Sequence, residues 1–316
     1  MSELKQFPLV SVVLTTYNGE KFLAQQIDSL LKQSYGNIEI IAVDDCSTDN
    51  SAVILNTFAA ENKNIRVYVN ETNLGYIKNF EKGCRLAQGE FIALCDQDDY
   101  WLENKIQRLM ESIGDYLMIY CDSMLCDEDL NETGHITSDY VVCKQWNSCL
   151  QLIVICRIYG HTILFKKELL QFAMPFLPGI SHDWWLPYIA TLHGGITYLA
   201  EPLARYRQHS ANIYGAIGAK RKKDIRQIEL PENRLKKERI QIRRRMDIFY
   251  QVLPGHLVKE KKIILALLKS YRSFSLKNNI SRVYLFFTHY ELFLAPKKRS
   301  VFRNWLFCLK MFIMIR

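Results

Sequence analysis

The sequence of 316 residues lacks the features that mark several common classes of protein. It has no run of about 18 or more apolar residues, so we expect no membrane-spanning helix. Its nine cysteines form no Cys-x-x-Cys pair, which disfavours metal sites at Cys121 and Cys126 or at Cys143 and Cys149. Reduced, buried thiols in a cytosolic protein are the simplest interpretation. Met1 to Pro8 is short and polar, so we expect no signal peptide.

Acidic residues are scarce in the last third of the chain. Residues 220–316 contain 25 basic and 7 acidic residues, a net charge of +18, whereas residues 1–219 contain 16 basic and 26 acidic residues, a net charge of −10. This asymmetry predicts two regions with different roles. We place the boundary near residue 218, with a catalytic domain at 1–218 and a basic, mainly helical region at 219–316.

The first 100 residues contain β-branched runs that alternate with segments of helical periodicity. Strands are predicted at Leu9–Thr16, Ile38–Val43, Ile65–Val69 and Phe91–Cys95, with a helix after each of the first three. This order predicts right-handed βαβ units and a parallel sheet covered by helices on both faces. The fold class is therefore α/β, with a Rossmann-like sheet.

Beyond residue 100 the pattern is mixed. It predicts strands at Leu117–Cys121, Thr162–Phe165 and Gly195–Leu199, and helices at Cys149–Ile158 and Trp184–His193.

Polar and acidic residues stand at the ends of three predicted strands. Thr15 to Asn18 ends the first strand, Asp44 and Asp45 follow the second, and Asp96 to Asp99 follow the fourth. Sheets of this kind bind ligands at the carboxyl ends of their strands. The sequence therefore predicts a ligand site at this edge, with Asn18 as the expected N-cap of the first helix.

The cluster Asp96-Gln97-Asp98-Asp99 contains three carboxylates within four residues. Their repulsion is relieved by Mg²⁺ or Mn²⁺, which completes its coordination shell with substrate phosphates. The alternative is a solvated acidic turn in which Asp98 or Asp99 caps a helix that begins near Trp101. Asp98 is the preferred metal ligand, and Asp96 and Asp99 are interchangeable at this stage.

Asp44 and Asp45 suit hydrogen bonds from a nucleobase or a ribose. Ser47 or Asp49 equally suits the N-cap of the helix that follows, so we assign ligand contact to Asp44 and Asp45 and a structural role to Ser47 to Asn50.

Four segments together resemble the family 2 glycosyltransferases: Ser11 to Asn18, Val43 to Asp49, Asn73 to Gly75 and Gly89 to Asp99. Their order and spacing match, and the resemblance covers about residues 8–215. It implies a GT-A fold, a nucleotide-diphosphate sugar donor and inversion at the anomeric carbon.

The same resemblance implies roles for individual residues. Asp96 and Asp98 would form the Asp-x-Asp motif for metal and ribose, with Asp99 as a further metal candidate. Lys78 would meet the diphosphate, although a lysine on a helix surface is the commoner interpretation. The implied donor-binding residues are Thr15, Tyr17, Asn18, Asp44, Asp45, Lys78, Asp96, Gln97 and Arg207.

Inverting transfer, which the resemblance implies, requires a base, and the segment His182-Asp183-Trp184-Trp185 contains a candidate. The resemblance assigns this role to Asp183, which also suits a helix N-cap. His182, Trp184 and Trp185 are candidates for acceptor contact, and core packing is as good an interpretation of the two tryptophans.

A Tyr-Arg-x-His pattern follows at Tyr206 to His209 and continues to Asn212. Arg207 suits a diphosphate leaving group, and His209 suits a metal ligand or a hydrogen-bond donor. His161 is a further acceptor candidate or a structural histidine.

The basic region has several interpretations. Lys236, Lys237, Arg239 and Arg243 to Arg245 surround apolar residues in a basic amphipathic pattern, and the apolar run Trp305 to Arg316 is too short to span a membrane. Clustered cations with aromatics favour an anionic membrane surface. A helical subdomain with a solvated face and an oligomer interface are the alternatives. Nucleic acid is not an expected partner, because no nucleic-acid-binding motif is present.

Together these observations predict a cytoplasmic, metal-dependent glycosyltransferase, peripheral to the inner face of the cell membrane. It would move a sugar to a glycan or lipid-linked acceptor in cell-surface polysaccharide synthesis. Resemblance to rhamnosyltransferase-like members favours a dTDP-rhamnose donor, with UDP- and GDP-sugars as the other options. A sugar nucleotidyltransferase would need a Gly-rich loop that Thr15 to Gly19 does not supply. A non-catalytic lipid- or partner-binding protein on a degenerate transferase fold is the second rival.

Overall fold

The computed structural model describes residues 7–209 and 231–312. Contacts divide the chain into two compact units, which are described separately: Met1–Gln145 with Ile158–Ile217, and Trp146–Arg157 with Gly218–Arg316. The boundary that we place near residue 218, the segment Lys220 to Lys223 and residues 210–212 of the Tyr-Arg-x-His pattern lie outside the described residues. So do the side chain of Lys236 and residues 313–316.

In the described part of the first unit, nine strands form one sheet in the order β3-β2-β1-β4-β8-β6-β9-β5, with β7 paired to β6. The strands are β1 Val10–Thr16, β2 Ile38–Asp44, β3 Ile65–Val69, β4 Phe91–Cys95, β5 Tyr100–Trp101, β6 Met118–Cys126, β7 Glu132–Ile136, β8 Ile163–Lys166 and β9 Ile196–Arg207. The helices of this unit are α1 Glu20–Leu31, α2 Ser51–Glu61, α3 Tyr76–Leu86, α4 Lys105–Ser112, α5 Leu170–Ala173 and α6 His182–His193, with short 3₁₀ turns at η1 Thr137–Asp139, η3 Gly160–Thr162 and η4 Lys167–Leu169.

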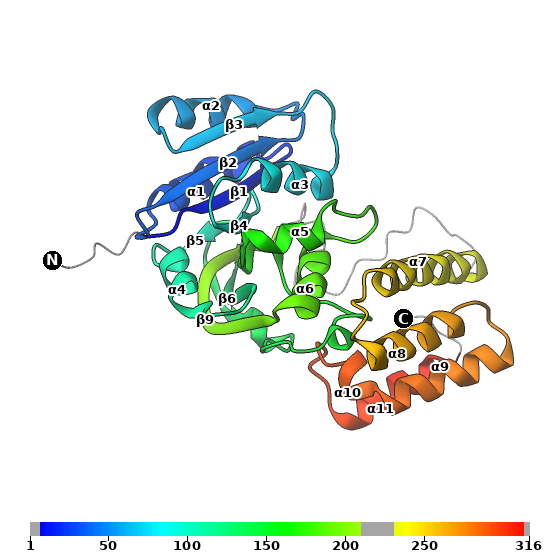
Figure 1. Cartoon of the computed structure of the whole chain (residues 1–316). Helices are drawn as coiled ribbons and strands as arrows, with labels where there is room; N and C mark the ends of the chain where they lie inside the picture. The colour runs from blue at the N-terminus through cyan, green and yellow to red at the C-terminus, as the bar shows by residue number, and fades with distance from the viewer. Residues whose placement is uncertain (1–6, 210–230, 313–316) are drawn as a thin grey trace. The chain divides into compact units, whose positions relative to one another are not determined.

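The first four strands are parallel, as the sequence pattern predicts (Figure 1). The register pairs Thr16 with Asp44 and Leu14 with Cys95, so the carboxyl ends of β1, β2 and β4 reach one edge together. Helix α3 carries the chain from β3 back across the sheet to β4, on the other side of β1. The strand order therefore reverses between β1 and β4, where open α/β sheets bind their ligands.

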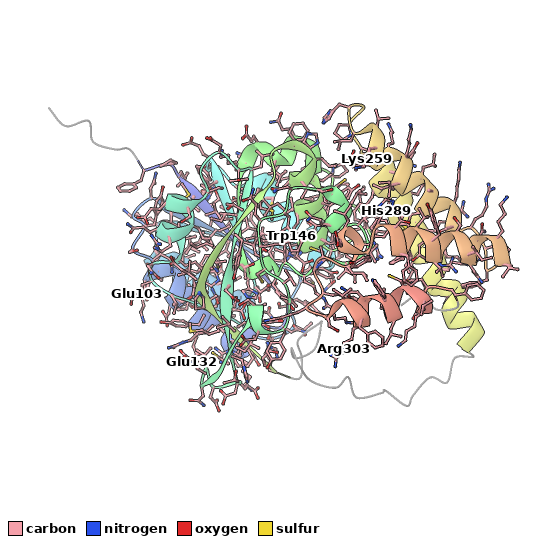
Figure 2. The ribbon with its side chains drawn as sticks, turned by 90° about the horizontal axis from the view of Figure 1, so that it is seen from below. Glu103, Glu132, Trp146, Lys259, His289 and Arg303 are labelled. Atoms are coloured by element: carbon pink, nitrogen blue, oxygen red, sulfur yellow. The ribbon has the colours of Figure 1, made fainter. Side chains whose placement is uncertain are left out.

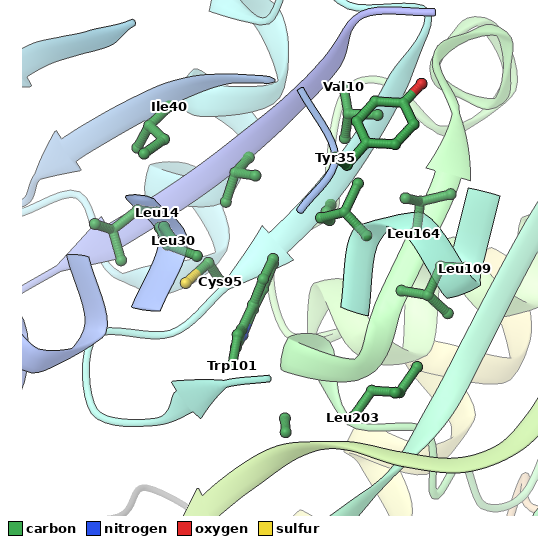
Figure 3. Packing of buried hydrophobic residues seen from close by; sticks show 14 of the residues in the cluster. Val10, Leu14, Leu30, Tyr35, Ile40, Cys95, Trp101, Leu109, Leu164 and Leu203 are labelled. Atoms are coloured by element: carbon green, nitrogen blue, oxygen red, sulfur yellow. The ribbon is translucent and has the colours of Figure 1, made fainter. Parts of the chain in front are cut away.

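The core lies on both faces of this parallel half. On one face, Leu14, Leu30, Cys95 and Trp101 are buried together (Figure 3). On the other face, α3 lies close to β1 because Gly83 has no side chain: a Cβ there would be 2.3 Å from Val13 Cγ1. Close packing of both faces holds the strand ends in fixed positions.

The second half of the sheet is mixed, and there one predicted strand end is wrong and the alternative of a capped helix near Trp101 does not hold. Strand β9 continues to Arg207 instead of ending near Leu199. Trp101 lies in β5, which pairs with β9, and α4 begins only at Lys105 after Asn104, so neither Asp98 nor Asp99 caps it. These boundaries depend on the pairing of β5 with β9, which is about 100 residues away in the sequence. Local periodicity does not reveal such a distant pairing.

The predicted helix Cys149–Ile158 is also wrong. The structure has only a 3₁₀ turn there, η2 Cys149–Gln151, followed by irregular backbone. Leu150, Leu152 and Ile153 are nevertheless buried, because this segment belongs to the second unit and contacts its helices. A short apolar run does not reveal whether a helix or a loop buries it.

The described part of the second unit is otherwise helical. Its helices are α7 Pro231–Gln251, α8 Val258–Ser270, α9 Leu276–Thr288, α10 Tyr290–Phe293 and α11 Val301–Lys310. Met246, Phe249, Ile264, Leu267 and Phe286 are buried and form its core. None of the helices within residues 7–209 and 231–312 has the length and the hydropathy that a membrane crossing requires.

Candidate active site

A cavity of about 540 Å³ opens at the edge where the parallel strands end. It lies wholly within the first unit and receives side chains from the ends of β1, β2, β4 and β9 and from α3 and α6. The predicted site residues that line it are Thr15, Tyr17, Asn18, Asp45, Asp96, Gln97, Asp98, His161, His182, Asp183 and His209. The predicted residues that do not line it are Asp44, Lys78, Asp99, Trp184, Trp185 and Arg207.

Asp44 and Asp45 have different roles despite being neighbours. Asp44 is buried, and its two carboxylate oxygens accept hydrogen bonds from the backbone N–H and the hydroxyl of Ser47, at 2.9 and 2.5 Å. Asp45 lines the cavity and accepts from the backbone N–H groups of Leu74 and Gly75, at 2.8 and 2.9 Å. Asp44 therefore shapes its own loop, while Asp45 holds the turn that begins α3 against the cavity.

Asn18 is not the N-cap of α1, since Gly19 occupies that position. Asn18 instead has a left-handed backbone, with φ of 49°, and its side-chain oxygen accepts from Thr48 N at 2.8 Å. This hydrogen bond joins the loop after β1 to the loop after β2. Asn tolerates the left-handed region better than most residues, which explains its use here.

Gln97 connects the acidic cluster to the loop after β1. Its Oε1 accepts from Thr16 Oγ1 at 2.6 Å and from Tyr17 N at 2.7 Å. Gly19 leaves the space for this side chain, because a Cβ at that position would lie 2.4 Å from Gln97 Oε1. The absence of a side chain at Gly19 thus permits the contact between Gln97 and the loop after β1.

The acidic cluster separates into two neighbouring arrangements. Asp98 Oδ2 lies 2.8 Å from His209 Nε2, and both residues line the cavity. The second arrangement combines Asp96, Asp99 and His161, whose ligand atoms lie within 4.8 Å of one another. Burial raises the pKa of Asp96 to about 8, and the Asp98 and Asp183 carboxylates add to that shift.

Asp99 lies beneath the cavity. It is buried, and its Oδ1 accepts from Arg207 N at 3.1 Å, while its Oδ2 is 3.3 Å from His161 Nδ1 without a hydrogen bond. His161 in turn lies 2.8 Å from Ser123 Oγ, and burial lowers its pKa, so it is neutral. Asp99, His161 and Ser123 thus form a buried group next to the cavity, and His161 is the member of this group that lines it.

Asp183 lies in the first turn of α6 and faces the cavity. It is not the N-cap, because Ser181 occupies that position. Burial raises the pKa of its carboxyl to about 6, and a hydrogen bond with Ser181 opposes the rise. An aspartate with this pKa is ionised at neutral pH yet more basic than an exposed one, as a general base should be.

His182 packs its ring on Phe80, with 3.9 Å between the ring centroids, and edge-on to Tyr76. Neither ring nitrogen has a hydrogen-bond partner among the described residues, and burial lowers the pKa to about 3. His182 is therefore a neutral wall of the cavity. Trp185 is a core residue whose Nε1 donates to Ala173 O at 2.7 Å, and Trp184 is partly buried outside the cavity lining.

Two predicted diphosphate contacts lie away from the cavity lining. Lys78 forms an ion pair with Glu81 at 2.6 Å and donates to Phe176 O at 3.0 Å. Arg207 is buried at the end of β9, where its Nε donates to Asp98 O at 2.8 Å and its Nη2 to Gln25 Oε1 at 2.8 Å. Arg207 thus positions the acidic cluster through the Asp98 backbone.

The comparison with family models adds one decisive observation. A model described as glycosyl transferase family 2 matches residues 11–172, just over half of the chain. The chain belongs to glycosyl transferase family 2. The resemblance that we inferred from its strand-end motifs is confirmed, and the protein is a glycosyltransferase.

Three relatives of this glycosyltransferase come from bacteria. An uncharacterized glycosyltransferase of Haemophilus influenzae is 30% identical over 182 residues, which are 56% of this chain and 68% of the relative. GlyG of Streptococcus pneumoniae is 41% identical over 105 residues, 33% of this chain and 35% of GlyG. TuaG of Bacillus subtilis, named for teichuronic acid biosynthesis, is 30% identical over 46% of this chain and 62% of TuaG.

Solved structures confirm the GT-A-like fold of this glycosyltransferase. S. aureus TarS 1-349, in complex with UDP-GlcNAc, aligns with a TM-score of 0.59 at 22% identity and covers 96% of this chain and 80% of its own. The mannosyltransferase PcManGT from Pyrobaculum calidifontis, in complex with GDP-Man and Mn²⁺, aligns at 0.53 and 14% identity over 98% of this chain and 86% of its own. At these identities the likeness concerns the fold alone.

The structure adds site residues to which we assigned no role from the sequence. They share positions on the cavity wall, and all are aromatic or amide side chains: Asn73, Tyr76, Asn79, Phe80, Tyr159 and Tyr206. Tyr76, Asn79 and Phe80 recur at helical spacing immediately after the Asn-Leu-Gly turn. That spacing is the signal that would have placed them on one face of α3.

Proposed function

We propose that this glycosyltransferase is an inverting, metal-dependent enzyme that moves a sugar from a nucleotide-diphosphate donor to an acceptor hydroxyl in the synthesis of a cell-surface polysaccharide. One observation carries the proposal. The candidate base Asp183 and the candidate metal ligands Asp98 and His209 line the same 540 Å³ cavity, beside Thr15 and Asp45 at the strand ends. In this proposal a nucleoside site, a diphosphate site and a base share one cavity.

Asp183 provides the proton transfer. Its carboxylate accepts the proton of the acceptor hydroxyl while that oxygen forms a bond to the anomeric carbon. The bond between the anomeric carbon and the donor diphosphate breaks, and its electron pair leaves with the diphosphate. Attack on the face opposite the leaving group inverts the configuration. The raised pKa of Asp183 increases its affinity for this proton.

The residues present fit a divalent cation. Asp98 and His209 already bring an oxygen and a nitrogen donor to 2.8 Å of each other on the cavity wall, and Asp96 adds a second carboxylate. We propose that Asp98 and His209 hold Mg²⁺ or Mn²⁺, with Asp96 beside them and Asp99 supporting the loop. When bound, the cation neutralises charge on the departing diphosphate.

The identity of the donor is the next part of the proposal. Structural neighbours bind UDP-GlcNAc and GDP-Man, which supports a nucleotide-sugar as the class of donor. The rhamnosyltransferase-like sequence pattern makes dTDP-rhamnose the first donor to test. The name of TuaG, which refers to teichuronic acid biosynthesis, supports a glycan or lipid-linked acceptor. We place the enzyme in the cytoplasm, with residues 219–316 at the inner face of the membrane.

The substitution Asp183→Asn tests the chemistry. It keeps the size of the side chain but removes the base, so we expect kcat to fall by about 10²- to 10⁴-fold. Binding of the donor, measured by calorimetry with Mn²⁺, should stay within about twofold, since Asp183 acts on the acceptor. The exposed Asp115, replaced in the same way, is the matched control. Unchanged turnover by Asp183→Asn would refute the assignment of the base.

Thermal-shift measurements with UDP-, GDP- and dTDP-sugars and Mn²⁺ test the donor class. Selective stabilisation by one nucleotide would identify it, because a ligand that binds only the folded state raises the melting temperature. No stabilisation by any of them would favour a non-catalytic binding protein. Release of pyrophosphate from a nucleoside triphosphate would favour a nucleotidyltransferase.

A further inference from the structure

Helix α11 has an apolar surface that the core of the second unit does not use. Phe307 and Cys308 are buried, whereas Phe302, Trp305 and Leu309 are 67%, 50% and 56% exposed. Each helical residue is turned by about 100° from the last, so the exposed and the buried side chains lie on opposite sides of α11. The α11 face, as we name the exposed side, consists of Val301, Phe302, Trp305, Leu306 and Leu309.

The orientation of α11 is held by a buried arginine. Arg282 of α9 donates from Nε to Met311 O at 2.9 Å, just beyond the end of α11, and from Nη1 to Ser270 O at 2.7 Å, at the end of α8. The guanidinium group is fully buried in this arrangement. Loss of these hydrogen bonds would leave the buried carbonyl groups of Met311 and Ser270 unpaired. The hydrogen bonds therefore keep the α11 face exposed.

Cations border the α11 face. Arg299, Arg303 and Lys310 line one surface groove together with Leu306, Phe307 and Leu309. Figure 2 labels Arg303 on α11. Residues 292–312 contain no Asp or Glu, so no acidic side chain of this segment pairs with those cations. The groove therefore combines positive charge with exposed hydrocarbon.

We propose that the α11 face docks on an anionic phospholipid bilayer, with its apolar side chains in the interface and Arg299, Arg303 and Lys310 on lipid phosphates. Amphipathic helices with cations beside Trp, Phe and Leu bind membrane surfaces in this way. A second copy of the chain is a poorer occupant, because pairing two such faces would bring their cations together without acidic partners. The inference deepens the proposal that residues 219–316 meet the membrane.

The sequence offers two segments for a membrane contact, the basic helix α7 and the apolar run from Trp305, and the structure points to α11, which contains the start of that run. Met246 and Phe249 of α7 are buried in the core of the second unit. In the portion of α7 whose side chains are described, residues 237–251, Ile240 is the only large apolar side chain that is exposed. Over residues 237–251, helix α7 therefore offers charge, through exposed Arg243 and Arg244, but little exposed hydrocarbon.

Flotation of the full chain with vesicles tests the inference. Vesicles of phosphatidylcholine alone are compared with vesicles that also contain phosphatidylglycerol, at low and high salt. We expect binding only to the anionic vesicles, and at least about a tenfold loss for Phe302→Ser/Leu306→Ser, because two large apolar side chains no longer enter the interface. Arg303→Glu/Lys310→Glu should lose binding similarly and abolish its salt dependence.

Three further variants distinguish loss of membrane docking from a general effect of substitution on the protein. Val53→Ser changes a side chain that is 64% exposed in the first unit, and should bind as the unmodified chain does. Arg243→Glu/Arg244→Glu reverses the charge on α7, and should cost less binding than the α11 variants. Trp305→Phe keeps an apolar ring but should lose the blue shift of tryptophan emission on binding.

Several results would overturn the inference. Failure to bind anionic vesicles, equal binding by Phe302→Ser/Leu306→Ser, or a larger loss from the α7 variant would each do so. A dimer in light scattering that the α11 variants dissociate, with vesicle binding unchanged, would assign the face to a second copy. Flotation requires no catalysis, so these failures leave the transferase proposal intact, and loss of donor binding would leave membrane docking intact.

Discussion

His209 Nε2 lies 2.8 Å from Asp98 Oδ2, across 111 residues of sequence, on the wall of the cavity that also contains Asp183. The end of β9 brings His209 there, and the loop after β4 brings Asp98. The imidazole and the carboxylate contact each other directly. The same two atoms are suitable donors for a divalent metal, so this contact is the starting point for the first prediction.

Asp98→Asn should abolish metal-dependent binding of nucleotide and reduce donor hydrolysis by about two orders of magnitude or more, because the developing charge on the diphosphate is no longer neutralised. His209→Ala should weaken Mn²⁺ more than Mg²⁺, since the harder Mg²⁺ gains less from a nitrogen donor. Calorimetry with each metal measures both effects, and Asp115→Asn is the control. If Asp98→Asn kept metal-dependent nucleotide binding, the assignment of Asp98 as a metal ligand would be refuted.

Activity should depend on pH through Asp183. Burial raises its pKa to about 6, and the base must be unprotonated, so log kcat/KM should fall by about one unit per pH unit below pH 6 and level off above it. Rate profiles at saturating Mn²⁺ measure this limb. The residual activity of Asp183→Asn should lack it, and an identical acidic limb in that variant would assign the titration to another group.

Gln97→Ala should loosen the loop after β1. The substitution leaves Thr16 Oγ1 and Tyr17 N without their acceptor, which should lower the free energy of unfolding by about 1–2 kcal/mol. The KM for the donor should rise more than kcat falls, since the loop lines the cavity. Chemical denaturation and initial rates measure the two effects. Exposed Gln145→Ala is the control, and a Gln97→Ala variant with normal stability and KM would contradict the bridging role.

Gly160→Ala should disturb the wall next to the base. A Cβ there would lie 2.8 Å from His182 Nε2 and 3.8 Å from Asp183 Cβ, and His182 is held from behind by Phe80. We expect a loss of about 1–3 kcal/mol in the free energy of unfolding and a lower kcat. Gly36→Ala, where a Cβ meets nothing within 4 Å, should leave both unchanged. Equal stability and turnover for the two variants would show that His182 moves freely.

Local patterns in the sequence predicted the parallel half of the fold correctly. Alternating β-branched runs and helical periodicity identify β1 to β4, and strand ends in such sheets carry ligand residues. Asp45, Asp96 and Asp98 were accordingly expected near one another, and the structure places all three on one cavity, together with Asp183, which the family resemblance indicated. These predictions succeeded because each motif lies within a few residues of the element that positions it.

The sequence by itself thus determined the family and the class of fold, and it indicated which strand ends line the cavity. Only the tertiary structure decided which of two adjacent aspartates faces the cavity, that Arg207 supports Asp98 from outside it, and that α11 instead of α7 exposes an apolar face. Arg207 reaches Gln25 across 182 residues, and the partner of such a side chain depends on how distant strands pair. A periodicity of 2.0 or 3.6 residues describes one element, whereas burial and hydrogen bonding depend on which elements pack together.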